Sequence, residues 1–305
     1  MSEGVPKWVL GGAGAEVFRM LSEELAGSQL HSLLLEVMRR RAGARTPVEV
    51  LAQYQRDRFT SPASIDLREA LAIDAHLLAA AADFDAIELS PVAPLATCSA
   101  IALTDQNRVL SALRRTEVVS DPTNVLALEC ASRLRAAPDP VHLATSQRVV
   151  RAQPVPDVPG FSQHFRLFAL ASGGLEARNH ELTVTAMARH VVALLDGLDR
   201  LEHDGYRFGA RRVDLLATPA RAELGDRIAA ALAGRVDVAR RPLEHPYYSG
   251  GLRFMLWVTA PDGAELPLGD GGTFDWLARL LSSRRAVFVA SGLGAQLVAT
   301  RFREA

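Results

Sequence analysis

Two stretches of alternating apolar and polar residues, joined by a proline-rich segment, constrain the fold of this chain most strongly. They run from Val141 to Gln153 and from Phe161 to Ala171. Between them, residues 154–160 read Pro-Val-Pro-Asp-Val-Pro-Gly. Alternation with a period of two is typical of β-strands, and proline and glycine interrupt regular structure. The sequence therefore predicts a β-hairpin with a long, stiff loop.

Helical and extended segments follow one another along the rest of the chain. Apolar residues at helical spacing predict helices, and short apolar stretches predict strands. The predicted helices span residues 65–82, 181–201, 221–233 and 274–282, and the predicted strands span residues 84–92, 213–217, 252–259 and 286–290. Such a mixture, with strands linked mainly as hairpins, indicates an α+β fold: a mainly antiparallel sheet flanked by helices.

Residues 1–60 are predicted to form a separate helical appendage. Apolar residues recur at helical spacing within residues 16–41, and Thr46 is placed to cap a further helix whose first residue is Pro47. Because one hydrophobic core rarely exceeds about 300 residues, the remaining residues, 61–305, predict a single core domain.

Charge and cysteine content exclude several classes of function. The net charge of −1 and the lack of a basic stripe make nucleic acid, including tRNA, an unexpected partner. Cys98 and Cys130 are the only cysteines, and we see neither a leader sequence nor an apolar run of the ~20 residues that span a bilayer. We therefore expect a cytoplasmic protein without disulfides or membrane contact. The eight histidines show no metal-binding spacing, so no metal site is predicted.

The two strands of the hairpin carry the polar residues that point most directly to function. Arg151 and Gln153 share one face of the first strand, and His164, Arg166 and Phe168 share one face of the second. We expect Arg151 and Phe168 to project into one cavity, because a guanidinium binds phosphate and an aromatic ring stacks on a base. The alternative is a solvated sheet face with an incidental phenylalanine.

The order Arg151-Ala-Gln153, a loop, then His164-Phe-Arg-Leu-Phe168 resembles motif 2 of the class II aminoacyl-tRNA synthetases. In that family the arginine contacts the α-phosphate of ATP, the histidine or arginine of the loop reaches the terminal phosphate, and the phenylalanine stacks on adenine. The resemblance implies an ATP site formed by Arg151, Gln153, His164 and Phe168.

Further segments resemble this family, and its histidyl branch in particular. Residues 84–91, after a long helix, resemble motif 1, which forms the dimer interface. Tyr-Tyr-Ser-Gly at 247–250 is similar to a histidyl-specific Tyr-Tyr-Thr-Gly segment, and Gly-Gly-Thr-Phe-Asp at 271–275 resembles a Gly-Gly-Arg-Tyr-Asp segment. The resemblance implies a homodimer and the following substrate-binding residues: Tyr247, Tyr248, Gly250, Gly272 and Asp275.

Two further features complete the resemblance. Gly292 and Gly294 lie where glycine-rich motif 3 is expected, and they would let a ligand approach the backbone closely. The alternative is a glycine pair that ends a buried strand. Arg241 precedes the tyrosines near the position of the family's catalytic arginine, so Arg151 and Arg241 are the implied catalytic residues.

Departures from the motifs predict a degenerate ATP site. Gln153 replaces the motif 2 acid, and no arginine follows Gly294 at motif 3 spacing. We therefore predict a paralogue without an anticodon-binding domain that binds an amino acid, an adenine nucleotide or both. It would resemble the histidyl-like regulatory subunit of ATP phosphoribosyltransferase and act on an enzyme partner. The alternative is an active ligase that uses ATP and Mg²⁺ to adenylate an amino acid or another carboxylic acid.

Overall fold

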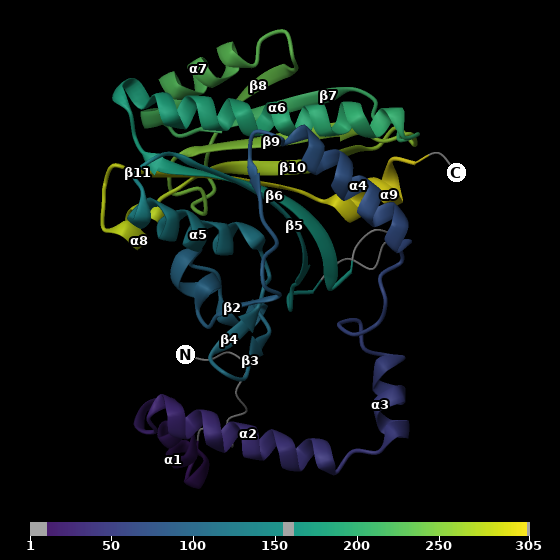
Figure 1. Ribbon diagram of the computed structural model, residues 1–305, viewed down its shortest axis with the longest axis vertical. Helices are drawn as coiled ribbons and strands as arrows, with labels where there is room; N and C mark the ends of the chain where they lie inside the picture. The colour runs from purple at the N-terminus through teal and green to yellow at the C-terminus, as the bar shows by residue number, and fades with distance from the viewer. Residues whose placement is uncertain (1–10, 155–161, 304–305) are drawn as a thin grey trace. The chain divides into compact units, whose positions relative to one another are not determined.

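The computed structural model describes residues 11–154 and 162–303, which form two compact units (Figure 1). The first unit comprises the chain up to Ser61 together with Ser111–Thr116, and the second comprises Pro62–Leu110 and the chain from Glu117 onward. The loop predicted at residues 154–160 lies, apart from Pro154, outside the described residues.

The first unit consists of short helices that bury little. They are α1 (Ala13–Arg19), the π-helix η1 (Met20–Glu24), α2 (Gly27–Gly43) and α3 (Pro47–Tyr54). Helix α3 begins as predicted: Thr46 Oγ1 accepts a hydrogen bond from Glu49 N at 3.3 Å, and Glu49 Oε2 accepts one from Thr46 N at 2.7 Å. None of residues 11–61 whose side chains are described is buried, and α3 is the one of these four helices whose N-cap side chain accepts a hydrogen bond.

An eight-stranded sheet forms the centre of the second unit, in the order β1-β5-β6-β11-β10-β9-β7-β8. Its strands are β1 (Asp85–Ala86), β5 (Val141–Val150), β6 (His164–Leu175), β7 (Arg211–Ala217), β8 (Asp237–Pro242), β9 (Leu252–Thr259), β10 (Glu265–Phe274) and β11 (Ala286–Leu293). Only the β1–β5 and β7–β8 pairings of these strands are parallel. The mainly antiparallel sheet that the sequence predicts is therefore confirmed.

Helices cover both faces of this sheet (Figure 1). The helices α4 (Leu67–Ala80), α6 (Glu181–His203), α7 (Ala222–Ala231) and α9 (Ala295–Arg301) bury one face in a large apolar core. On the opposite face, α5 (Pro122–Ala136) and α8 (Trp276–Leu281) cover part of the sheet in a second core. No helix within the described ranges is long and apolar enough to cross a membrane.

Short elements connect these helices and strands. They are β2 (Val92–Pro94), η2 (Thr97–Ile101), η3 (Gln106–Arg108), β3 (Ser111–Ala112), β4 (Thr116–Val118), η4 (Arg178–His180) and η5 (Pro219–Arg221). Residues from η2 and η3 line the cavity described below.

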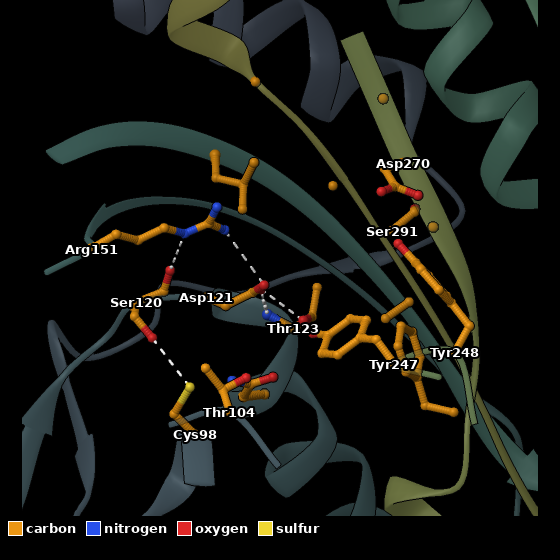
Figure 2. A pocket seen from close by; sticks show the side chains of 18 of the residues that line it. Cys98, Thr104, Ser120, Asp121, Thr123, Arg151, Tyr247, Tyr248, Asp270 and Ser291 are labelled. Atoms are coloured by element: carbon orange, nitrogen blue, oxygen red, sulfur yellow. Dashed lines mark hydrogen bonds and ion pairs between the residues drawn. The ribbon is translucent and has the colours of Figure 1, made fainter. Parts of the chain in front are cut away.

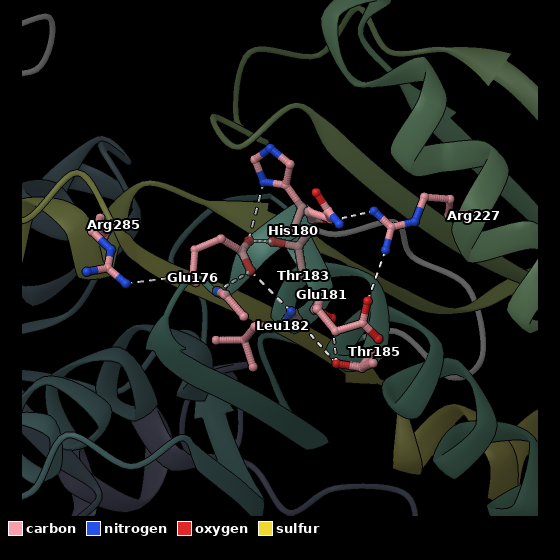
Figure 3. Close-up of polar contacts among 10 residues, drawn as sticks. Glu176, His180, Glu181, Leu182, Thr183, Thr185, Arg227 and Arg285 are labelled. Carbon is pink, nitrogen blue, oxygen red and sulfur yellow. Dashed lines mark hydrogen bonds and ion pairs between the residues drawn. The ribbon is translucent and has the colours of Figure 1, made fainter.

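Helix α6 begins at a strained turn (Figure 3). Asn179 and His180 both adopt left-handed backbone conformations, with φ of 56° and 57°. Such conformations are costly for residues other than glycine. The carboxylate of Glu176 compensates, because it accepts hydrogen bonds from Leu182 N at 3.1 Å and from the Thr183 hydroxyl, and so satisfies donors at the helix start.

Candidate functional site

A cavity of about 540 Å³ opens on the sheet face that α5 and α8 cover only in part. Leu167 of β6, Gly269–Gly271 of β10 and Ala290–Gly292 of β11 contribute to its wall (Figure 2). Further lining residues lie at the start of α5, in the loop of Tyr247 and Tyr248, between residues 98 and 109, and just after β5 at Arg151 and Gln153. The cavity therefore brings together segments that are far apart in the sequence.

The start of α5 contributes a carboxylate to the cavity. Asp121 caps the helix, since its Oδ1 accepts hydrogen bonds from Thr123 N at 3.0 Å and from Thr123 Oγ1 at 2.7 Å. Pro122 occupies the first helical position, where a backbone N–H has no partner within the helix, so proline loses no helical hydrogen bond there. The second carboxylate oxygen of Asp121 lies 3.6 Å from Nη2 of Arg151, so the cavity contains a guanidinium beside a carboxylate.

Three contacts orient Arg151. Its Nε donates a hydrogen bond to the carbonyl of Ser120 at 3.1 Å, and its guanidinium lies 5.0 Å from the ring centroid of Phe165. The third contact is the Asp121 carboxylate. Contacts within the protein therefore already hold the guanidinium in the cavity lining.

Aromatic residues line another part of the cavity. The rings of Tyr247 and Tyr248 meet edge to face at 5.3 Å, and Tyr247 makes a similar contact with Phe274 at 5.4 Å. Burial raises the pKa of both tyrosine phenols, which are therefore neutral at physiological pH. The Arg253 guanidinium lies 4.8 Å from the Tyr248 ring and binds Asp270 at 2.7 Å, which fixes that side of the wall.

Cys98 contributes a buried thiol. Ser120 Oγ donates a hydrogen bond to Cys98 Sγ at 3.6 Å. Burial raises the pKa of the Cys98 thiol, so it is not a thiolate nucleophile. The loop around it is anchored by the buried carboxylate of Glu117, which accepts hydrogen bonds from Cys98 N at 2.8 Å and Ala96 N at 2.9 Å.

The structure brings half of the predicted site residues together. The six that line the cavity are Arg151, Gln153, Tyr247, Tyr248, Gly292 and Gly294. An added Cβ at Gly292 would lie 3.4 Å from the Leu167 side chain, which is an ordinary contact. Packing alone therefore does not require glycine at position 292.

The prediction that Phe168 shares the cavity with Arg151 is wrong. Phe168 is fully buried in the core beneath α6 and pairs across the sheet with Leu293, whereas its neighbour Leu167 lines the cavity. The ring on the side of Arg151 belongs to Phe165. His164 and Arg166 mark one face of β6 as polar, but Arg166 binds Asp74 of α4, and residues 167–171 are apolar on both faces, so the alternation did not identify which face is the cavity wall.

His164 and Arg241 also lie away from the cavity lining. The ring of His164 contacts Arg148 NH1 through Nδ1 at 2.6 Å. Arg241 Nε donates a hydrogen bond to Asp214 at 2.9 Å, and the side chain of Arg241 is half-exposed. Neither residue is among the described residues that line the cavity.

Gly250, Gly272 and Asp275 have structural roles outside the lining. An added Cβ at Gly272 would lie 2.3 Å from the carbonyl oxygen of Leu252, and one at Gly250 would lie 2.4 Å from Thr273 Oγ1. Both glycines are therefore required by packing. Asp275 accepts a hydrogen bond from Ser249 Oγ at 2.7 Å and precedes α8.

Sequence reasoning missed several lining residues. They are Cys98, Thr104, Arg108, Ser120, Asp121, Thr123, Asn124, His245 and Asp270. One signal was present, because Asp121-Pro122 is a helix-start signature of the same kind as Thr46-Pro47. Within the described ranges, no group of three or more His, Cys, Asp or Glu side chains is arranged to hold a metal ion.

Comparison with known proteins yields matches to solved structures only. No family model matches the chain, and no curated protein sequence matches it. An ATP phosphoribosyltransferase regulatory subunit/histidyl-tRNA synthetase from Bacillus halodurans is similar in structure, with a TM-score of 0.60 at 14% identity over 79% of this chain and 81% of that one.

Two histidyl proteins are similar as well. The histidine–tRNA ligase subunit from Alicyclobacillus acidocaldarius has a TM-score of 0.56 at 13% identity, over 78% of this chain and 94% of that one. The apo histidyl-tRNA synthetase from S. aureus has a TM-score of 0.54 at 15% identity, over 76% of this chain but only 64% of that enzyme. At such identities the similarity concerns the fold alone. The chain has a class II aminoacyl-tRNA synthetase-like fold.

Proposed function

We propose that the chain binds a small zwitterionic ligand, of the amino-acid type, in this cavity and has a regulatory role instead of charging tRNA. The observation that carries the proposal is the pair of Asp121 and Arg151, whose charged groups lie 3.6 Å apart in the cavity lining. A carboxylate binds an ammonium group, and a guanidinium binds a carboxylate in a bidentate manner. The two charges of a free amino acid therefore have complementary partners side by side.

An adenine nucleotide fits the cavity less well. Of the four residues implied for ATP, Arg151 and Gln153 line the cavity, whereas His164 binds Arg148 and Phe168 lies in the core. The expected contacts to the terminal phosphate and to the adenine ring are therefore missing from these positions. We propose no reaction step that uses ATP or Mg²⁺, and nucleotide binding becomes one arm of the test.

A regulatory role is supported by the missing ATP contacts and by the fold. One of the similar structures is named an ATP phosphoribosyltransferase regulatory subunit/histidyl-tRNA synthetase. We propose that this chain forms a homodimer, as the motif 1 resemblance implies, and transmits ligand binding to an enzyme partner in the cytoplasm.

Isothermal titration of the full chain with each of the twenty amino acids, and with ATP plus Mg²⁺, tests the proposal. We expect at least one amino acid to bind, and Arg151→Ala to weaken its binding about 10- to 100-fold, since it removes a charged hydrogen-bond donor. Arg235→Ala is the matched control, because Arg235 forms an ion pair with Asp196 and is not among the described lining residues. Failure of every amino acid to bind would refute the proposal.

The alternative function, an acyl-adenylating ligase, has one observation in its favour. The cavity of about 540 Å³ has room for a ligand larger than an amino acid. Pyrophosphate exchange with each amino acid separates the two functions. Turnover that Arg151→Ala abolishes would establish a ligase and overturn the regulatory proposal.

A further inference from the structure

One part of the cavity wall is polar but uncharged. Cys98, Thr104 and Ser120 line it, and Cys98 and Ser120 are hydrogen-bonded to each other (Figure 2). The Cys98 thiol is protonated because burial raises its pKa, with hydroxyl groups of Ser120 and Thr104 beside it. This part of the wall therefore favours neutral polar groups over ions.

Asn124 is the unpaired polar group of this wall. Its side chain lines the cavity and the residue is only 2% exposed, yet its Oδ1 has no hydrogen-bond partner among the described residues. A buried acceptor without a partner costs on the order of 1–3 kcal/mol. Buried polar groups are nearly always paired, so an unpaired acceptor on a side chain that lines a cavity points to a donor that the ligand supplies.

The position of Asn124 relative to Asp121 defines what such a ligand must look like. The two residues are three apart at the start of α5, a spacing that places side chains on the same side of a helix. When the ammonium group of an amino-acid ligand binds Asp121, the side chain of the ligand is therefore the part that can reach Asn124. Tyr247, Asp121 and Cys98 line the same cavity, so an aromatic ring also faces this space.

We infer, resting on the proposed function, that the ligand is an α-amino acid whose side chain ends in a neutral hydrogen-bond donor, an amide or a hydroxyl, and that Asn124 determines this specificity. A cationic side chain has no spare carboxylate here, because Asp121 binds the ammonium group and Asp270 is bound to Arg253. An apolar side chain leaves the Asn124 oxygen unpaired. Only a neutral donor forms a hydrogen bond with the Asn124 oxygen without burying a charge against this wall.

Matched pairs of ligands test this inference by isothermal titration of the full chain. Glutamine and methionine, asparagine and leucine, and threonine and valine have similar shapes but differ in the donor. We expect the polar member of at least one pair to bind about tenfold or more tightly than its apolar counterpart, since a site built for a hydrogen bond disfavours a ligand that lacks it. Apolar members that bind equally well, or glutamate that binds better than glutamine, would overturn the inference.

The variant Asn124→Leu assigns the preference to one side chain. Leucine has the branching and the number of side-chain heavy atoms of asparagine and removes the unpaired oxygen, but it is larger, so thermal melting of the variant first shows that it folds. We expect the polar-over-apolar preference to shrink to about twofold or less. A preference that persists at full size in the folded variant counts against Asn124. If this variant does not fold, the titrations of the unmodified chain still decide the ligand class.

Asp121→Asn distinguishes failure of the inference from failure of the proposed function. It removes the carboxylate that the proposal assigns to the ammonium group, so all amino acids should bind more weakly while the preference between pair members remains. Binding without any preference would overturn the specificity of Asn124 and leave the proposed function standing. No binding of any amino acid to the unmodified chain would overturn both.

Discussion

Acid should destabilise this protein through one buried histidine. His190 of α6 is fully buried, and its ring nitrogens lie 2.9 Å from Ser172 Oγ and 2.9 Å from Ser291 Oγ. Burial, together with nearby His142 and Arg189, lowers the pKa of His190 to about 3. The neutral ring donates through one nitrogen and accepts through the other, so both serine contacts are compatible with the uncharged form.

The sign and size of the effect follow from this lowered pKa. The unfolded chain holds a histidine with an ordinary pKa near ~6.5, so it binds a proton that the folded chain excludes. The stability is therefore complete above about pH 6.5 and is lost as the pH falls toward the folded-state pKa. Each pH unit in that window costs about 1.4 kcal/mol, which gives a loss of about 2 kcal/mol between pH 7 and pH 5.

Urea unfolding at pH 7 and pH 5, followed by circular dichroism, measures this loss. Other groups also titrate in this range, so the comparison is with His190→Gln, which stays neutral at both pH values. We expect the unmodified chain to lose about 2 kcal/mol more than His190→Gln over this interval. His203→Gln, which removes an exposed histidine, controls for the loss of an imidazole. Equal losses in the unmodified chain and His190→Gln would refute the reasoning.

Three further predictions concern packing and assembly. Asp74→Ala should lower the free energy of unfolding by about 3–5 kcal/mol in urea titrations, because it strips the carboxylate from Arg166, 2.6 Å away, in a largely buried ion pair. Gly272→Ala should lower the melting temperature markedly, since the new Cβ would meet the Leu252 carbonyl; an unchanged melting temperature would contradict this packing. The motif 1 resemblance predicts a homodimer, and sedimentation that shows a stable monomer at micromolar concentration would count against it.

Strands with ordinary strand composition could be predicted from the sequence, and β10 could not. The hairpin of β5 and β6 follows from its alternating residues and its proline-rich loop. Strand β10 spans Glu265–Phe274 and includes a proline and three glycines, a composition that strands usually avoid. Yet an added Cβ at Gly271 would lie 2.4 Å from Ser291 Cβ on the neighbouring strand. The glycines that allow β10 to lie close to its neighbouring strand are therefore the residues that make the segment unlike a strand in composition.

The faces of β6 could not be assigned from the sequence, for a different reason. Helix α6 packs on one face of β6. The other face packs against α5 and also lines the cavity, so both faces carry apolar residues. A shift of one residue exchanges Leu167 and Phe168 without changing the apolar pattern. In the structure Phe168 packs in the core beneath α6, and Leu167 faces the cavity.

The charged pair of the site depends on a convergence that local signals do not encode. Asp121-Pro122 indicates where a helix starts, and the end of the alternating stretch at Gln153 indicates where a strand ends, although β5 itself ends at Val150. Neither local sequence pattern indicates that the start of this helix and the end of this strand lie next to each other in the fold. They meet because α5 packs against β5 and β6, which brings Arg151 to the Ser120 carbonyl and to the Asp121 carboxylate. The packing of α5 on the sheet therefore sets the distance between the two charges. Mutations that loosen this packing should weaken binding of a ligand that contacts both charges, even where the mutated residues do not line the cavity.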